Sequence, residues 1–93
     1  MQPAPNRAVL LANGIPRDHA ELAVRVGELR VAKGWNWGTL AKEAGPGMRN
    51  TQIRAIERGT HNPTFSTLMK LARALDLRSL DELLGELPFS ALR

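Results

Sequence analysis

The side chains best suited to chemistry in this chain lie within one short segment, residues 50–58. Asn50, Thr51 and Arg54 bring an amide, a hydroxyl and a guanidinium group to it. A guanidinium can bridge O6 and N7 of guanine or hold a phosphate, and an amide can pair with N6 and N7 of adenine. Simpler uses also exist, because Asn50 can cap a helix and exposed arginines such as Arg54 and Arg58 are commonly just solvated. The surrounding pattern has to decide between these interpretations.

Residues for catalysis or metal binding do not form a recognisable set. The chain has no cysteine, which excludes disulfides, thiolate zinc sites and a thiol nucleophile. His19 and His61 lack a companion carboxylate or cysteine at ligand spacing, so we expect no metal and no cofactor. The segment Gly45-Pro46-Gly47 lacks the following lysine and the preceding strand of a phosphate-binding loop. We therefore expect a protein that is not an enzyme.

The elements that must position the polar segment are predicted to be helices. Apolar residues recur at helical spacing and no segment alternates as a strand does, so the fold class is all-α. Helices are expected over residues 19–33, 37–44, 51–58, 65–75 and 80–84. The expected inward-facing residues are Leu22, Val26, Leu29, Ala32, Leu40, Ala41, Ile53, Ile56, Phe65, Leu68, Leu71, Ala72 and Leu75.

Helix starts are marked by polar residues with capping chemistry. Asp18 with Glu21, and Ser79 with Glu82, have the spacing of a capping box. The other expected N-caps are Asn36, Asn50 or Arg49, and Thr64. Glycine and proline close the predicted helices, most clearly at Gly45-Pro46-Gly47.

Composition divides the 93 residues into one small domain with two appendages. Residues 1–17 are an N-terminal arm with one helical turn at Ala8–Ala12, residues 18–87 form the helical domain, and residues 88–93 are a short apolar tail. No apolar run approaches the ~20 residues of a membrane span, and the N-terminus does not resemble a signal peptide. We therefore expect no membrane association and a cytoplasmic location.

The net charge of +4 is unevenly distributed. Residues 1–73 hold 11 basic and 5 acidic residues, whereas residues 74–93 hold 2 basic and 4 acidic ones. A basic body suits a polyanionic partner, although a charge of this size is also compatible with an ordinary solvated surface.

The order and spacing of short motifs resemble the lambda-repressor-like family of helix-turn-helix domains, the Cro/repressor or XRE type. The motifs are Leu29-Arg30, Lys33-Gly34-Trp35, Leu40-Ala41, Ile53, Ile56-Glu57-Arg58-Gly59, Asn62-Pro63, Leu71-Ala72-Arg73-Ala74-Leu75 and Leu80-Asp81-Glu82-Leu83-Leu84. The resemblance covers about residues 22–84. It implies a five-helix bundle that binds double-stranded operator DNA, usually as a two-fold homodimer, with its third helix in the major groove.

The resemblance also assigns roles to individual residues. It places four residues against base edges: Asn50, Thr51, Arg54 and Ala55. It places six residues near phosphates: Trp37, Arg49, Arg58, Thr60, His61 and Asn62. It further implies a structural ion pair between Arg30 and Glu57.

The chain departs from the family pattern at two places. The turn within Gly45-Pro46-Gly47-Met48 is about two residues longer than usual, which leaves the orientation of the next helix open. Trp37 stands where the family often has a glutamine that meets a phosphate. Its indole N–H can donate to a phosphate, or the ring can pack on Trp35 or face a partner protein.

Partners follow from these features. Val24 and Val31 lie off the main apolar stripe of their helix and require a second cover. The candidates are Val9–Ala12 of the arm or the apolar tail, from the same subunit or from its mate, and we favour self-association over a cover within one chain. The leading interpretation is a transcriptional regulator, and its alternative is an antitoxin whose arm or tail occludes a toxin-like protein while DNA binding serves autoregulation. A helix-turn-helix fold that has lost DNA binding is a third possibility, given the longer turn.

Overall fold

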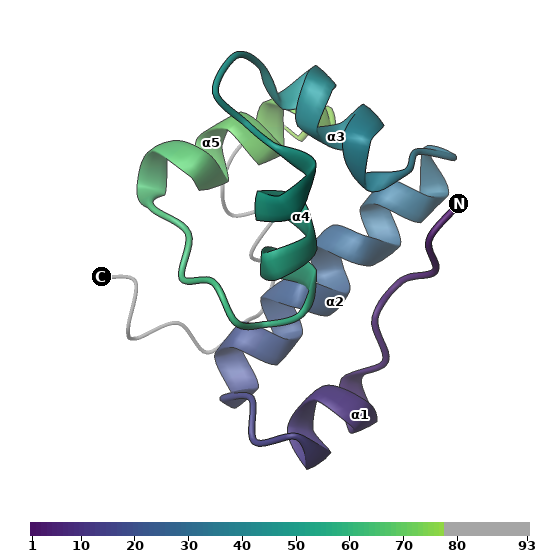
Figure 1. Ribbon diagram of the computed structural model, residues 1–93, viewed down its shortest axis with the longest axis vertical. Coiled ribbons are helices and arrows are strands. Elements are labelled where there is room, and N and C mark those ends of the chain that lie inside the picture. The colour runs from purple at the N-terminus through teal and green to yellow at the C-terminus, as the bar shows by residue number, and fades with distance from the viewer. Residues whose placement is uncertain (78–93) are drawn as a thin grey trace.

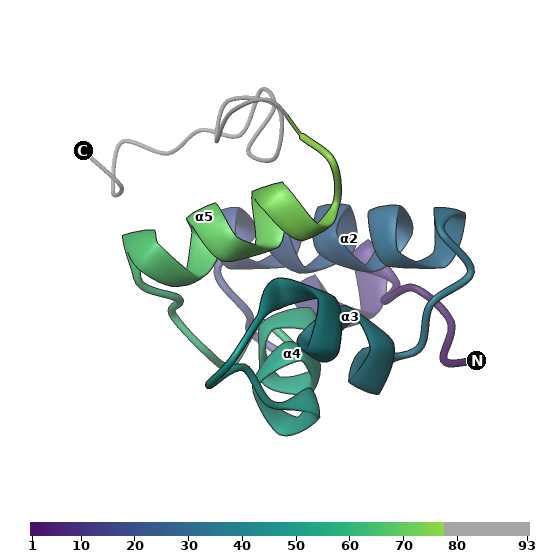
Figure 2. The ribbon, with the colours of Figure 1, turned by 90° about the horizontal axis from the view of Figure 1, so that it is seen from above.

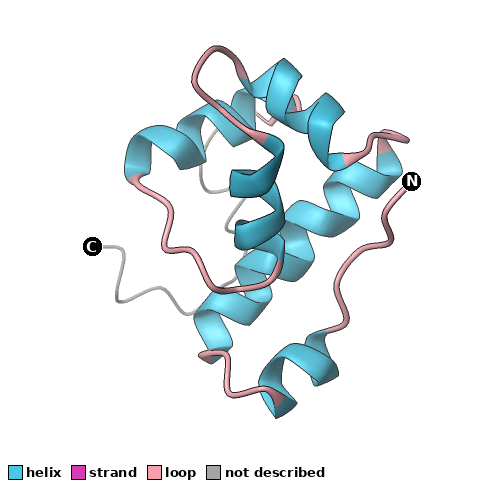
Figure 3. Ribbon diagram, in the orientation of Figure 1, coloured by secondary structure: helices cyan, strands magenta, loops and turns pink. Residues whose placement is uncertain are grey.

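The computed structural model describes residues 1–77, which form five helices with no strand among them (Figures 1 and 3). In chain order they are α1 (Arg7–Ala12), α2 (Arg17–Ala32), α3 (Trp37–Ala44), α4 (Asn50–Glu57) and α5 (Phe65–Ala74). The predicted all-α class is confirmed, and α2 to α5 are the first four predicted helices. The predicted helix at 80–84, its Ser79 cap and the tail at 88–93 lie outside the described residues. No helix in the described part is long and apolar enough to cross a membrane.

The start of α2 differs from the prediction. The helix begins at Arg17 after Pro16, whose φ of −55° is already suited to a helix start. Asp18 therefore lies inside the first turn, where its carboxylate accepts a hydrogen bond from the His19 N–H at 2.9 Å. The capping box predicted for Asp18 and Glu21 is absent, because Glu21 instead accepts a hydrogen bond from Arg7 in α1.

Two other predicted starts are confirmed. The Asn36 side chain accepts from the Thr39 N–H at the start of α3, and the Thr64 side chain accepts from the Thr67 N–H at the start of α5. Each cap satisfies one of the backbone donors that the first helical turn leaves without an intrahelical partner. The local sequence is thus sufficient to fix where α3 and α5 begin.

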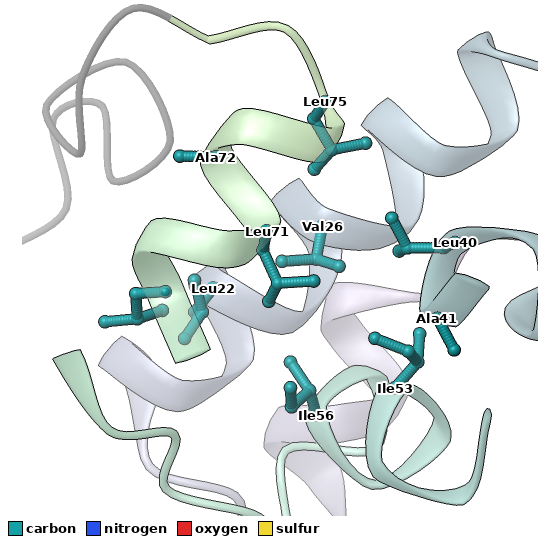
Figure 4. Close-up of a cluster of buried hydrophobic side chains, with 10 residues drawn as sticks. Leu22, Val26, Leu40, Ala41, Ile53, Ile56, Leu71, Ala72 and Leu75 are labelled. Atoms are coloured by element: carbon teal, nitrogen blue, oxygen red, sulfur yellow. The ribbon is translucent and has the colours of Figure 1, made fainter. Parts of the chain in front are cut away.

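The main core lies where α2, α3, α4 and α5 converge (Figure 4). Its buried residues are Leu22, Val26, Leu40, Ala41, Ile53, Ile56, Leu68, Leu71, Ala72 and Leu75, all of which were predicted to face inward. Ala32 and Phe65 were also predicted inward, but both are exposed, Phe65 to 70%. They lie at the end of α2 and the start of α5. Helical spacing predicts which way a side chain points, but it does not show whether another helix lies there to cover it.

A second, smaller core joins α1 to α2. Leu10 packs there with Ala20, Ala23 and Val24, and Ile15 covers the cluster from one side. The second cover that Val24 requires therefore comes from the same chain. Val24 therefore gives no support for self-association, although Val31, the other residue of this face, is half-buried and is not part of the cluster.

The segment preceding α1 runs beside α2 toward the start of α3 (Figure 1). The carbonyl of Pro3 accepts from Nη2 of Arg30 at 3.1 Å, and Oε1 of Gln2 accepts from the backbone N–H of Trp37 at 3.0 Å. Pro5 passes so close to Gly27 that a Cβ on this glycine would overlap Cδ of the proline ring. Glycine at position 27 is what allows the segment to lie against α2.

We expect Gly27→Ala to bring no gain in stability, although alanine in a helix interior is normally about 0.8–1 kcal/mol better than glycine. The new methyl group would displace Pro5 and lie 3.1 Å from Oε1 of Glu57. Gly38→Ala in α3 is the matched control, because its Cβ would meet only Oδ1 of Asn36 at 3.5 Å. Urea denaturation followed by circular dichroism gives both unfolding free energies. Equal stabilisation by the two substitutions would contradict the position of the arm.

Candidate nucleic-acid interface

The pair α3 and α4 forms a helix, turn and helix on one side of the molecule. Figure 2 shows the two helices together in the lower part of the view, with α5 and α2 above them. The turn uses left-handed backbone at Gly45 and Gly47, with φ values of 115° and 87°, which residues with a side chain rarely adopt. Ile53 and Ile56 of α4 are nonetheless buried in the core. The longer turn therefore still returns α4 against the bundle.

The outer face of α4 is polar and exposed. Asn50, Thr51 and Arg54 are all exposed, whereas Ala55 is half-buried. The N-cap position belongs to Arg49, and no side chain caps this helix. The capping role considered for Asn50 is therefore wrong, because Asn50 is the first helical residue. Three of the four predicted base-facing residues lie together on an accessible helical surface.

Most of the predicted phosphate contacts flank α4. Arg49 lies at its start and Arg58 at its end, and both are exposed. Thr60 and Asn62 follow in the next loop and are exposed, while His61 is half-buried. The Thr60 hydroxyl donates to the carbonyl of Ala55 at 3.3 Å, which ties this loop back to the helix. The structure thus places a cationic residue at each end of the exposed face.

The predicted pairing of Arg30 and Glu57 is present as a buried, two-point ion pair between α2 and α4. Nε of Arg30 donates to Oε2 of Glu57 at 2.7 Å, and Nη2 donates to Oε1 at 2.9 Å. The side chains are 0% and 3% exposed. The other donors of Arg30 reach the Trp35 carbonyl at 2.8 Å and the Pro3 carbonyl at 3.1 Å. One side chain thus links α2, α4, the loop before α3 and the arm.

Trp37 extends this network to the surface of α4. Its indole N–H donates to Oε1 of Glu57 at 3.2 Å. The structure therefore corrects the phosphate contact predicted for Trp37, because this N–H is already bonded within the protein. The guanidinium of Arg54 lies 5.4 Å from the centroid of the indole ring, and that of Arg30 lies 6.0 Å from it. The Trp35 ring has a different cationic partner, Lys33, at 5.1 Å.

Gln2 and Pro3 are the residues of this network that sequence reasoning missed. Both lie in a proline-rich arm with no periodic pattern, and their partners are 35 and 27 residues away. Local signals report on caps, turns and helical faces within a few residues. No such signal could have placed the Gln2 amide at the start of α3.

Comparison with known protein families also identifies α3 and α4 as part of a helix-turn-helix domain. A helix-turn-helix family profile matches residues 26–83, which is more than half of the chain. The match includes α3, the glycine turn and α4. Comparison with curated proteins and with solved structures finds no match.

We expect Glu57→Ala to lower the free energy of unfolding by about 3–5 kcal/mol, because it leaves the buried Arg30 charge without its carboxylate. Glu43→Ala is the control, since Glu43 is an exposed carboxylate of α3. Thermal denaturation measures both. Equal shifts in melting temperature would show that the buried pair does not support the fold.

Proposed function

Because this chain belongs to the lambda-repressor-like helix-turn-helix family, whose members bind DNA, we propose that it is a sequence-specific transcriptional regulator of the cytoplasm. It acts by binding an operator and not by catalysis. In this proposal α4 enters the major groove, with Asn50, Thr51 and Arg54 facing base edges. The observation that carries the proposal is the exposed polar face of α4, which has an arginine at each end.

The dimensions of α4 suit this role. An α-helix with its side chains is about 10–12 Å across, and the major groove of B-DNA is about 12 Å wide. The opposite face of α4 is held by Ile53, Ile56 and the ion pair of Glu57, so the helix presents its polar face in one orientation. Within residues 1–77, no hydrogen bond or ion pair occupies the Arg54 guanidinium, which supports its availability to a base.

Contacts with the phosphates of the DNA backbone would supply much of the affinity for DNA. Arg49 and Arg58 lie at the two ends of the eight-residue helix α4, and the exposed Asn62 adds a neutral side-chain donor in the loop that follows. Each phosphate neutralised by a cation releases counterions, so binding weakens steeply as salt rises. Such contacts set the register of α4 on the duplex and leave sequence discrimination to the base-facing residues.

We further propose that the protein binds its operator as a two-fold homodimer. One short recognition helix touches few base pairs, whereas two copies related by a dyad read two half-sites about one helical turn apart. The dimer is a proposal about the DNA complex and does not depend on an apolar face of α2.

Selection of bound sites from random duplex DNA, read by sequencing, is the direct test of this function. We expect an inverted repeat whose half-site centres lie about 10 base pairs, or ~34 Å, apart. A single unrepeated site would contradict the homodimer but would remain consistent with a sequence-specific regulator. Enrichment of no sequence at all would contradict sequence-specific binding.

We expect Arg54→Ala to weaken binding to the selected site by about 1–3 kcal/mol and to relax the preference at one base pair. Arg73→Ala is the matched control, because Arg73 is an exposed arginine of α5 and its loss changes the net charge equally. Fluorescence anisotropy with labelled duplexes measures both affinities. Retained affinity with an unchanged site preference would exclude Arg54 as a base-reading residue.

A further inference from the structure

We infer that Trp37 is a positioning residue for DNA recognition, which holds the guanidinium of Arg54 in place for contact with a base. The inference deepens the proposed function and rests on it. It assigns to Trp37 a role in specificity without contact to DNA. Three features of the structure support it: the Trp37 ring is anchored, the Arg54 guanidinium lies over that ring, and the second nearby cation, Arg30, is neutralised.

The ring of Trp37 is fixed from the protein interior. Its indole N–H donates to Oε1 of Glu57 at 3.2 Å, and that carboxylate is itself held by two hydrogen bonds from the buried Arg30. The backbone N–H of Trp37 donates to Gln2 at 3.0 Å, which secures the first turn of α3. Trp37 packs against the main core and is half-buried. The indole ring of Trp37 is thus held in place next to the exposed face of α4.

Arg54 lies over the indole ring of Trp37. The carbon at the centre of its guanidinium is 5.4 Å from the ring centroid, within the ~6 Å range of a cation–π interaction. A guanidinium held by the ring at this distance has no hydrogen-bond partner on the indole, so its N–H donors can still reach a base or a phosphate. Without the ring, an exposed arginine samples many rotamers, and binding to DNA would have to order it.

The ion pair beneath the ring makes this arrangement favourable. The Arg30 guanidinium also lies 6.0 Å from the Trp37 centroid, so two cations share one aromatic ring. The Glu57 carboxylate neutralises Arg30 directly. The electrostatic attraction of the ring is therefore available to Arg54 without an uncompensated positive charge close by.

The test separates the ring from its N–H group. Trp37→Leu removes both, whereas Trp37→Phe removes the hydrogen bond to Glu57 and keeps a smaller aromatic face. Trp35→Leu is the matched control, because the Trp35 ring is also half-buried and also carries a cation, but the cation is Lys33 of the α2 end. The readout is discrimination: the Kd for a duplex altered at the base pair read by Arg54, divided by the Kd for the selected duplex.

We expect Trp37→Leu to lower this ratio about two- to fivefold, Trp37→Phe to lower it less, and Trp35→Leu to leave it unchanged. In an Arg54→Ala background, Trp37→Leu should lower the ratio no further, because the two residues act through one contact. Equal losses for the leucine and phenylalanine variants would overturn the inference, since the hydrogen bond to Glu57 would then be responsible. An additive loss in the double variant would overturn it as well.

A spectroscopic measurement on the free protein keeps the inference testable if Trp37→Leu does not fold. Trp35→Phe leaves Trp37 as the sole tryptophan of the chain, which has two. We expect Arg54→Ala to raise quenching of its fluorescence by acrylamide, and Arg73→Ala to leave quenching unchanged. Unchanged quenching in the Arg54→Ala variant would overturn the contact between Arg54 and the Trp37 ring in solution.

The outcomes also separate this inference from the proposed function. If Arg54→Ala lowers discrimination and Trp37→Leu does not, the inference fails and base recognition by Arg54 stands. If Arg54→Ala leaves discrimination unchanged, the inference and base recognition by Arg54 both fail, whereas sequence-specific binding by the protein is judged separately by the site selection. Discrimination lost in Arg54→Ala and reduced in Trp37→Leu supports both.

Discussion

The buried ion pair between Arg30 and Glu57 is the interaction on which the rest of this structure depends. Two charges at 0% and 3% exposure are tolerated only because the geometry is two-point and the remaining donors of Arg30 reach backbone carbonyls. Such a network is unfavourable if any member is missing, because each unsatisfied group would then be left in a low-dielectric interior. It therefore enforces one relative placement of α2 and α4.

This constraint reaches the surface through Trp37. The same carboxylate that neutralises Arg30 accepts the indole N–H, and the indole ring lies beneath the guanidinium of Arg54. A chain of direct contacts thus runs from the interior to the exposed face of α4. The features that define the proposed DNA-binding surface are consequently tied to the fold itself. The arm adds to this rigidity, because Gln2 and Pro3 bond to the same network.

Much of the fold could be read from local patterns. The caps at Asn36 and Thr64, the glycine turn after α3 and the inward stripe of α5 depend on residues a few positions apart, and the structure agrees with them. Failures occurred where neighbours in space decide the outcome. Phe65 has the right spacing for the core but lies exposed at the start of α5, and Val24 is covered by Leu10 of α1 in the same chain.

By itself, the sequence determined the helical class, most helix boundaries and the residue types of the α4 face, because periodicity and capping act over a single turn. It also suggested the pairing of Arg30 with Glu57 through a family resemblance. Only the tertiary structure decided that the indole of Trp37 faces Glu57, that Arg54 lies over this ring, and that the arm reaches the start of α3. These contacts join segments 17 to 35 residues apart, and their geometry exists only once the helices have packed.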